Sequence, residues 1–482
     1  MTLPFEIADD AATPLFLRIA RAIIADIERG RLKAGAKMPG TRTLAADLGV
    51  HRKTVVAAYE ELVLQGWITI LPSRGAMVAL DLQVPDRPAR PEPAPGRETS
   101  FTAGRSSDTG ERPPALAFSD GTPDPRLLPR GELARAFRRA LGAPAFLSPG
   151  GYGDPRGNPR LRAALADWLA GSRGLAIGAD DVLITRGSQM ALFLAARAVA
   201  EAAGAIAVED PGYPLAWTAF RAAGARIVGV PVDGDGIDIA ALDALARRDR
   251  AIRAVLVTPH HHYPTTVTLG AGRRLALLKL AATHGWTVIE DDYDHEYRYE
   301  GRPILPLAAS APAGARSVIY VGSLSKLLAP GLRLGYAIAA PDLIGTMAAA
   351  REAIDRQGDV PLEAAIAELI ADGELRRHAR KARKTYLARR DLLIAALRRD
   401  LGDAIAFDVP AGGLALWLRV RPDIDAGLWA RRALDEGLKV PTGVAFAFDP
   451  DSAPNAFRLG FAALDPGEIA RAVHLLSAAR PR

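Results

Sequence analysis

The chain has 482 residues, more than one hydrophobic core usually organises, so we expect at least two domains. Hydrophobic residues make up 49% and no stretch of membrane-spanning length is free of charge, which favours a soluble globular protein over a membrane protein. The lack of cysteine excludes disulfides and thiolate chemistry, and the net charge of +6 is compatible with a polyanionic partner. The first ten residues are acidic and resemble no signal peptide, so we expect a cytoplasmic location.

The first eighty residues have the spacing of a small helical unit. The first predicted helix has an apolar stripe at every fourth residue, formed by Leu15, Ile19, Ile23 and Ile27. A second, short helix follows Pro39 and is expected to bury Leu44, Ala45 and Leu48. Gly49 then supplies a sharp turn into a third helix that begins near His51.

The third predicted helix has the pattern of a DNA-recognition helix. Its inward positions are Val55, Tyr59 and Leu62. They turn Arg52, Lys53 and Thr54 outward at the N-terminal end, where a recognition helix meets the major groove. Two β-rich runs, 67–71 and 76–80, predict a hairpin wing with Arg74 at its tip. The alternative is a three-helix packing module whose outward cations are only solvated.

These elements resemble the GntR-type winged helix-turn-helix. The resemblance is carried by MPGTRTLAADLGVHRKTVVAAYEELVLQGWI and PSRGAMV. It implies that DNA is contacted by Arg42, Arg52, Lys53, Thr54, Arg74 and the backbone at Gly75. The chain departs from the family at Gly40, where serine is usual, and at His51, where a small polar residue is usual.

Residues 81–114 are rich in Pro, Arg, Glu, Gly and Ser and lack apolar periodicity, which predicts a partly extended linker. It would separate a DNA-binding domain over residues 11–80 from a second domain over residues 115–482. In the second domain, helical patterns alternate with short β-rich runs, as in an α/β domain with a mostly parallel sheet. The runs expected as buried strands are 182–184, 255–257, 288–289 and 318–321.

The strongest motif is SLSK followed by PGLRLGY, directly after one of these strands. A lysine beside hydroxyls and an arginine in apolar surroundings loses its proton more easily and forms a Schiff base with an aldehyde. Lys326 is therefore the candidate aldimine lysine. Ser323, Ser325 and Arg333 are expected to bind the phosphate of the same cofactor.

Three further segments add groups to this predicted site. Asp291 and Tyr293 lie two apart at the end of a strand and are expected to contact the nitrogen and oxygen of a pyridine ring. Ser188 and Gln189 lie where a helix opens after a strand, an arrangement that binds phosphate. Tyr213 is placed to stack on the cofactor ring.

From about residue 115 to residue 482 the chain resembles the fold-type I aminotransferases. The resemblance implies pyridoxal 5'-phosphate as cofactor and a smaller C-terminal α+β subdomain. The YGDPRG loop supplies Tyr152, and the FRLGF motif supplies Arg458, which the family uses to bind a substrate carboxylate. The loop that is usually Asn-Pro reads TPHHHYPTT, with Thr266 where glycine is usual. We expect no metal on the His260-His261-His262 triplet, because neighbours on an extended chain point to opposite sides.

A GntR-type domain joined to an aminotransferase-like domain is similar to the MocR or GabR-like family of transcription regulators. The resemblance implies a head-to-tail homodimer in which each DNA-binding domain lies over the partner's large domain. The expected function is a regulator that senses an amino compound through Lys326. Two alternatives stay open: an active aminotransferase with a DNA-binding appendage, and a regulator for which the cofactor itself is the signal.

Overall fold

The structure is a computed structural model of the whole chain. It describes residues 13–28, 30–71, 75–80, 115–119, 121–147, 152–200, 204–301, 304–310 and 318–481. The predicted linker and Arg74 lie outside these residues. Within the described part, no helix combines the length and the apolar character that a membrane span requires.

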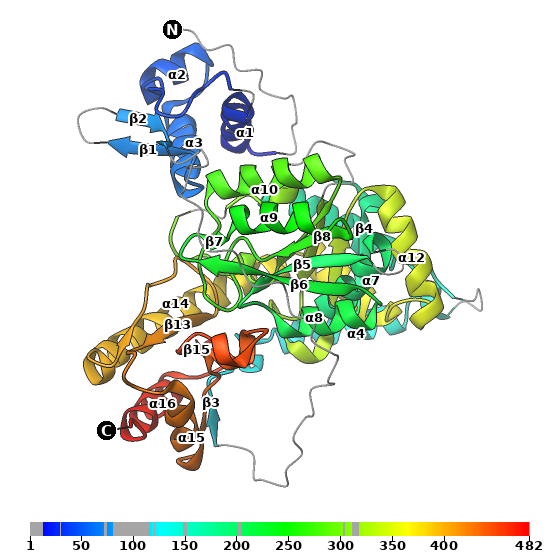
Figure 1. Cartoon of the computed structure of the whole chain (residues 1–482). Helices are drawn as coiled ribbons and strands as arrows, with labels where there is room; N and C mark the ends of the chain where they lie inside the picture. Colours follow the sequence, from blue (N-terminus) through cyan, green and yellow to red (C-terminus); the bar gives the residue numbers. More distant parts are fainter. Residues whose placement is uncertain are drawn as a thin grey trace.

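The N-terminal unit has three helices and a two-stranded hairpin (Figure 1). They are α1 (Leu15–Glu28), α2 (Thr41–Asp47), α3 (Arg52–Leu64), β1 (Ile68–Leu71) and β2 (Gly75–Val78). The predicted inward residues of the third helix, Val55, Tyr59 and Leu62, are buried in one cluster with the α1 stripe. Leu48 is only half-buried, since it follows the end of α2 and points partly outward.

The large domain is built on an eight-stranded sheet. In chain order the strands are β4 (Val182–Thr185), β5 (Ala205–Asp210), β6 (Arg226–Asp233), β7 (Gly236–Ile237), β8 (Ile252–Val257), β9 (Thr287–Asp292), β10 (Val318–Ser323) and β11 (Gly335–Ile338). In space the order is β4-β11-β10-β9-β8-β5-β6-β7. Only β11 and β7 run antiparallel to their neighbours, so the sheet is mostly parallel, as predicted.

Helices cover both faces of this sheet, which explains why its strands are apolar throughout. One face packs on α7 (Gly187–Val199), α8 (Pro214–Ala222) and α12 (Pro341–Asp355). The other packs on α9 (Ile239–Arg248), α10 (Ala271–His284) and α11 (Leu307–Ser310). On β9, Val288 and Ile289 point to opposite faces and join different clusters.

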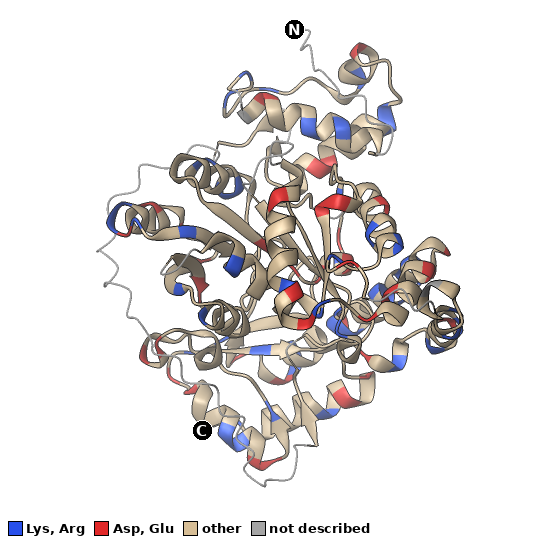
Figure 2. Ribbon diagram, turned by 90° about the vertical axis from the view of Figure 1, so that its right-hand side faces the viewer, with Lys and Arg blue, Asp and Glu red and all other residues tan. Residues whose placement is uncertain are grey.

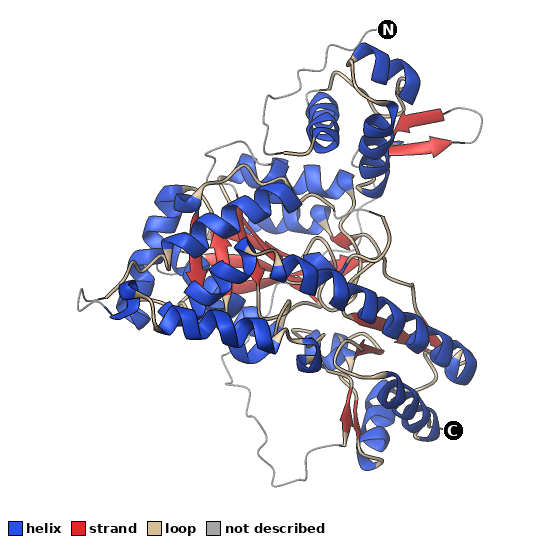
Figure 3. Ribbon diagram, turned by 180° about the vertical axis from the view of Figure 1, so that it is seen from behind, coloured by secondary structure: helices blue, strands red, loops and turns tan. Residues whose placement is uncertain are grey.

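The remaining helices and the C-terminal subdomain share the largest apolar cluster. The helices in this cluster are α4 (Arg130–Leu141), α6 (Pro159–Arg173) and α13 (Val360–Ala371), and the short helix α5 (Pro144–Leu147) follows α4. The subdomain contains β3 (Leu116–Ala117), β12 (Ile405–Ala406), β13 (Ala415–Val420), α15 (Ala426–Asp435), β14 (Leu438–Lys439), β15 (Ala456–Gly460) and α16 (Pro466–Ala478). The long helix α14 (Glu374–Leu401) runs from the large domain along this subdomain (Figure 3).

Short 3₁₀ turns complete the described part: η2 (Pro125–Leu127), η3 (Ala179–Asp181), η4 (His295–Tyr297), η5 (Pro330–Leu332), η6 (Gly443–Phe446) and η7 (Pro450–Ser452). Two of them, η4 and η5, follow strands β9 and β10 and lie next to the candidate site. Strands β8, β9 and β10 are parallel neighbours, so their carboxyl ends meet at one edge of the sheet, where open α/β folds bind ligands.

Candidate functional site

A small pocket lies at this edge of the sheet. It is lined by Ser188, Tyr213, Thr258, Tyr263, Asp291, Tyr293 and Lys326. Five of these were predicted site residues, and they come from the segments that follow β4, β5, β9 and β10. The structure thus brings the lysine, the carboxylate and the two predicted tyrosines together.

The loop that carries Lys326 is braced by hydrogen bonds of its own. The Ser325 hydroxyl accepts from the Leu334 backbone N–H at 3.1 Å, and the backbone N–H groups of Leu324 and Ser325 donate to the Leu334 carbonyl. The Ser323 hydroxyl accepts from the Lys326 backbone N–H at 3.4 Å. Neither serine lines the pocket. In this structure both hydroxyls hold the lysine loop, and phosphate contact by either stays a prediction.

The N-terminus of α7 lies against the same loop. Gly187 begins α7 at a φ of 73°, and a Cβ at that position would meet the Arg333 guanidinium at 2.7 Å. Arg333 also donates to the Arg186 carbonyl at 3.3 Å. Free backbone N–H groups and a guanidinium at one helix N-terminus form an anion site. Ser188 lies in the first turn of that helix and lines the pocket.

Asp291 is the most unusual group in the pocket. It is 3% exposed, and its Oδ1 has no hydrogen-bond partner among the described residues. Burial and the neighbouring Asp292 carboxylate raise the pKa of Asp291 to about 7, while Lys326 opposes the rise. A buried carboxylate of this kind is stabilised by a ligand that brings a proton or a positive charge to it.

Aromatic rings surround the pocket. The rings of Tyr213 and Tyr263 meet edge to face with centroids 4.8 Å apart. The Tyr293 hydroxyl donates to the His261 carbonyl at 2.9 Å. Sequence reasoning did not assign Thr258 or Tyr263, although both lie in the flagged loop after β8. Their position directly after a central strand could have predicted them as pocket residues, because open α/β sheets bind ligands at the carboxyl ends of their strands.

That loop keeps a conformation that glycine usually adopts. Thr266 has a φ of 64°, and its N–H donates to the His262 carbonyl at 2.7 Å. The buried Glu209 carboxyl accepts from the Thr258 N–H at 3.1 Å and from its hydroxyl at 2.8 Å. The loop departs from the family in sequence, yet it still places Tyr263 against the pocket.

Arg458 lies on β15 and is 1% exposed. Its guanidinium donates to the Pro264 carbonyl at 2.6 Å and lies 4.4 Å from the centre of the Tyr263 ring. Gly121 connects it to the lysine: Lys326 Nζ donates to the Gly121 carbonyl at 3.4 Å, and Arg458 Nη2 lies 3.9 Å from a Cβ built there. Arg458 and Lys326 therefore flank the same backbone position.

Besides the two serines, four predicted residues do not line the pocket: Arg333 and Arg458 lie beside it, and Tyr152 and Gln189 have other partners. Tyr152 is 71% exposed and stacks with Arg356, whose guanidinium lies 4.2 Å from the ring centre. The Gln189 amide donates to the Leu215 carbonyl at 2.5 Å. Neither side chain makes a hydrogen bond or a ring contact with a residue that lines the pocket, among the described residues.

The N-terminal unit presents its predicted DNA-contacting residues on the surface. Arg42, Arg52 and Lys53 are exposed, and Thr54 is half-buried at the start of α3. His51 caps α3, because its ring accepts from the Lys53 N–H at 3.1 Å. The unusual histidine thus replaces the small polar cap of the family. Figure 2 shows Lys and Arg positions along the helices of this unit.

The C-terminal part of α3 packs on the large domain. A Cβ on Gly66 would lie 3.6 Å from the Ala271 N of α10, and Ala271 belongs to the core cluster of the N-terminal unit. Glu61 of α3 is 0% exposed. Burial lowers the pKa of Arg298, and the Glu61 carboxylate opposes that change. The C-terminal end of α3 therefore lies against the domain that carries the pocket.

Comparison with known proteins agrees with both halves. Residues 15–78 match the family model "Bacterial regulatory proteins, gntR family", and residues 127–476 match "Aminotransferase class I and II". The chain is 31% identical to the probable rhizopine catabolism regulatory protein MocR of Rhizobium meliloti, over 98% of this chain and 94% of that protein. It is 32% identical to the HTH-type transcriptional regulator TauR of Rhodobacter capsulatus, over 97% and 98%.

A solved structure extends the similarity to the large domain. LysN, the α-aminoadipate aminotransferase of Thermus thermophilus, in complex with N-(5'-phosphopyridoxyl)-L-leucine, superposes with a TM-score of 0.69. The identity is 30%, over 76% of this chain and 91% of LysN. The protein is thus a GntR-type winged helix joined to a fold-type I aminotransferase domain. The chain belongs to the MocR-like family of transcription regulators.

Proposed function

We propose that this regulator holds pyridoxal 5'-phosphate on Lys326 and changes its binding to promoter DNA when an amino compound reaches that site. The observation that carries the proposal is that Lys326 lines one pocket with Asp291, whose buried Oδ1 has no hydrogen-bond partner among the described residues. The same chain carries helix α3, whose N-terminal end is exposed and whose C-terminal end lies against the same domain.

The residues present fit this cofactor. Pyridoxal phosphate supplies an aldehyde that condenses with a primary amine, and a ring that withdraws electrons when its nitrogen is protonated. Asp291 would hold that proton, since a partner of positive charge relieves its buried carboxylate. Ser188, Arg333 and the first N–H groups of α7 would bind the phosphate. Tyr213 and Tyr293 would contact the ring.

The effector would carry a carboxylate as well as an amine. Arg458 is buried and now donates to a backbone carbonyl, which a carboxylate can replace with a stronger, bidentate pair. Arg458 and Lys326 flank Gly121, so one small molecule can reach both. The surrounding apolar cluster includes Tyr263, Trp417 and Phe446 and keeps water away from this pair.

The signal to DNA would pass through α10. Arg274 of α10 donates to the carbonyls of Pro259, at 3.1 Å, and of Leu305, at 2.8 Å, so it holds the loop that carries Tyr263. Burial lowers the pKa of Arg274 to about 10, and Glu61 of the recognition helix is one of the carboxylates that oppose this. An effector changes DNA affinity only as far as it binds two arrangements of this contact unequally.

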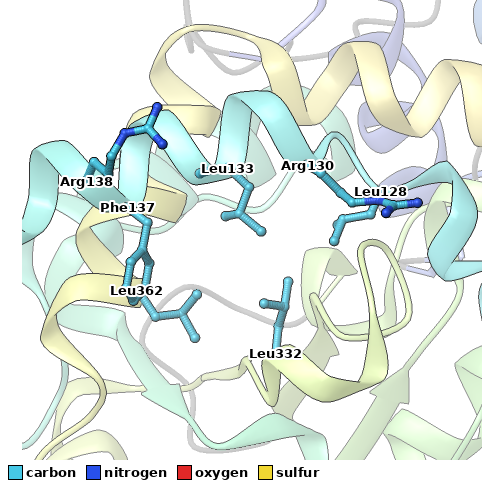
Figure 4. A pocket seen from close by; sticks show the side chains of 8 residues that line it. Leu128, Arg130, Leu133, Phe137, Arg138, Leu332 and Leu362 are labelled. Carbon is cyan, nitrogen blue, oxygen red and sulfur yellow. The ribbon is translucent and has the colours of Figure 1, made fainter.

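A homodimer would complete the site. An apolar groove lies beside the lysine loop (Figure 4) and is lined by Leu128, Leu133, Phe137, Leu332 and Leu362, with Arg130 and Arg138 at its rim. Leu332 directly precedes Arg333. The segment after α4 carries Phe146, Leu147 and Tyr152, which are 41%, 67% and 71% exposed. Exposed apolar side chains next to an apolar groove support a second copy of the chain as their partner.

Replacing Lys326 tests the proposal. K326A should lose the visible absorbance of the bound cofactor and the response of DNA affinity to amines, while the fold is retained. The control is K279A on α10, where the lysine is exposed and far from the pocket lining, and which should keep both. If K326A keeps the absorbance, the lysine is misassigned.

An active aminotransferase is the second candidate, favoured by the 30% identity to LysN. Sustained conversion of an amino donor and a keto acid acceptor by the wild-type protein would support it. A single spectral change that stalls while DNA affinity shifts would support the regulator. A shift caused by pyridoxal phosphate alone, without an amine, would make the cofactor itself the signal.

A further inference from the structure

Three buried side chains from two segments of the chain lie close together outside the pocket. They are His260 in the loop after β8, Asp292 at the end of β9 and His295 in η4. Their exposed fractions are 4%, 3% and 5%. One potential ligand atom from each lies within 4.8 Å of those of the other two. None of the three lines the cofactor pocket.

The hydrogen bonds around His260 leave two lone pairs facing each other. His260 Nε2 lies 2.6 Å from the Ile304 carbonyl oxygen, which only accepts, so Nε2 carries the proton. The Nδ1 of the neutral ring is then an acceptor. It faces Asp292 Oδ1 at 3.5 Å, and neither atom has a hydrogen-bond partner in the described part of the chain. Two buried acceptors without a donor between them are costly.

His295 adds a third unsatisfied nitrogen. Its Nδ1 lies 2.8 Å from Asp292 Oδ2, so it donates there, and its Nε2 has no partner among the described residues. The rings of His260 and His295 are edge to face, with centroids 4.7 Å apart. A positive ion among these atoms would satisfy the facing lone pairs.

We propose that His260, Asp292 and His295 form a binding site for one divalent transition-metal ion of the zinc class. Two nitrogens and a carboxylate oxygen are ligands that such ions take. In a tetrahedral zinc site with bonds of about 2.1 Å, ligand atoms lie about 3.4 Å apart, close to the observed 3.5 Å between His260 Nδ1 and Asp292 Oδ1. His295 supplies the third ligand atom, which lies within 4.8 Å of those of His260 and Asp292 and would lose any proton it carries when the ion binds.

Neighbouring groups fix the orientation of the His260 ring and the Asp292 carboxylate, as they usually do for metal ligands. The bond from His260 Nε2 to Ile304 fixes the ring and its tautomer. The Tyr320 hydroxyl donates to Asp292 Oδ2 at 2.6 Å and fixes the carboxylate. The nearby cations have other hydrogen-bond partners: Arg173 pairs with Glu296, and Arg274 donates to backbone carbonyls. Neither arginine makes a hydrogen bond with the Asp292 carboxylate among the described residues.

The rest of the histidine triplet takes no part. His261 Nδ1 lies 2.8 Å from Asp294 Oδ1, and His262 Nδ1 lies 2.7 Å from the Thr265 hydroxyl. The three rings thus have different partners, as expected for neighbours on an extended segment. The proposed site uses one of them with two residues that lie about thirty positions further along the chain.

A bound ion would join the loop that carries Tyr263 to the segment that carries Asp291 and Tyr293. It would therefore hold the cofactor-contacting groups in place, as a structural ion rather than a reacting one. The inference does not rest on the proposed function, because the ligands lie outside the cofactor pocket. Metal binding is measured on the full-length protein without added pyridoxal phosphate.

The test compares H260S and H295S with H474S, which removes an exposed histidine on α16. Chelator-treated proteins are titrated with Zn²⁺ by calorimetry and with Co²⁺ by visible absorption. Wild type and H474S should bind one ion per chain with a tetrahedral cobalt spectrum, and H260S and H295S should bind at least about tenfold more weakly. Equal binding by H260S, or no stoichiometric binding by wild type, would overturn the proposal.

A second measurement covers the case in which a variant loosens the loop. Zn²⁺ should raise the melting temperature of the wild-type protein, because the ion binds only the folded chain. D292N keeps the shape of the side chain but removes its charge, and its melting temperature should not respond to Zn²⁺. An equal rise in D292N would show that the ion binds elsewhere and would also overturn the proposal.

Discussion

Gly335 holds the N-terminus of α7 against the lysine loop, and adding one methyl group there should disrupt the phosphate site. A Cβ on Gly335 would lie 2.6 Å from the Gly187 carbonyl carbon and 2.7 Å from the Ser188 N. Carbon atoms pack at about 3.5 Å, so the start of α7 must move by about 1 Å. Overpacking of this kind costs about 1–3 kcal/mol. We expect G335A to bind pyridoxal phosphate about ten to a hundred times more weakly.

The matched control is G331A, four residues earlier in η5, because a Cβ on Gly331 would meet nothing within 4 Å. Both variants are stripped of cofactor and titrated with pyridoxal phosphate, with absorbance and intrinsic fluorescence as readouts. Far-UV circular dichroism shows whether each variant is folded. Equal affinity of G335A and G331A would refute the assignment of the α7 N-terminus as the phosphate site.

Three more predictions concern DNA, effector and pH. R52A should weaken specific DNA binding, measured by fluorescence anisotropy, by about 1–3 kcal/mol and leave the cofactor absorbance unchanged. An unaltered DNA affinity would contradict the assignment of α3 as the recognition helix. R458Q should weaken the response to carboxylate-bearing amines at least about tenfold while cofactor uptake stays intact, whereas an unchanged response would place the carboxylate elsewhere. Burial raises the pKa of Glu209 to about 8, so its folded form binds a proton that the unfolded chain releases near pH 4.5. The contribution of Glu209 to the free energy of unfolding therefore falls as the pH rises from about 4.5 to about 8. The melting temperature of E209Q minus that of wild type should rise from pH 5 to pH 9. A constant difference would show that Glu209 is already ionised at pH 5.

Much of the architecture follows from local patterns in the sequence. The fourfold stripe of α1 and the inward residues of α3 predict their burial, because a helix face is set by spacing alone. Short, continuously apolar runs predict β4, β8, β9 and β10, because strands covered on both faces are apolar at every position. Lys326 and Asp291 could be found because Asp291 lies at the end of β9 and Lys326 lies just after β10, and neighbouring parallel strands end at a common edge.

What could not be predicted depends on contacts between distant segments. Thr258 and Tyr263 line the pocket because Glu209, about fifty positions earlier, holds the Thr258 backbone. The hydrogen bond from the Leu334 N–H to the Ser325 hydroxyl, nine positions apart, could not be read from the motif, and phosphate contact by Ser325 stays a prediction. The meeting of His260 with Asp292 and His295 arises from the parallel pairing of β8 with β9, which sequence spacing does not reveal.

The central claim is that chemistry at Lys326 is linked to DNA binding, and one titration of the wild-type protein tests it directly. The protein, supplied with pyridoxal phosphate and fluorescent promoter DNA, is titrated with candidate amino compounds while absorbance and anisotropy are recorded together. We predict that, for the right amine, both signals change with the same midpoint. The account would be contradicted by a protein that shows no visible absorbance with pyridoxal phosphate. It would also be contradicted if no amine that changes the spectrum changes the DNA affinity.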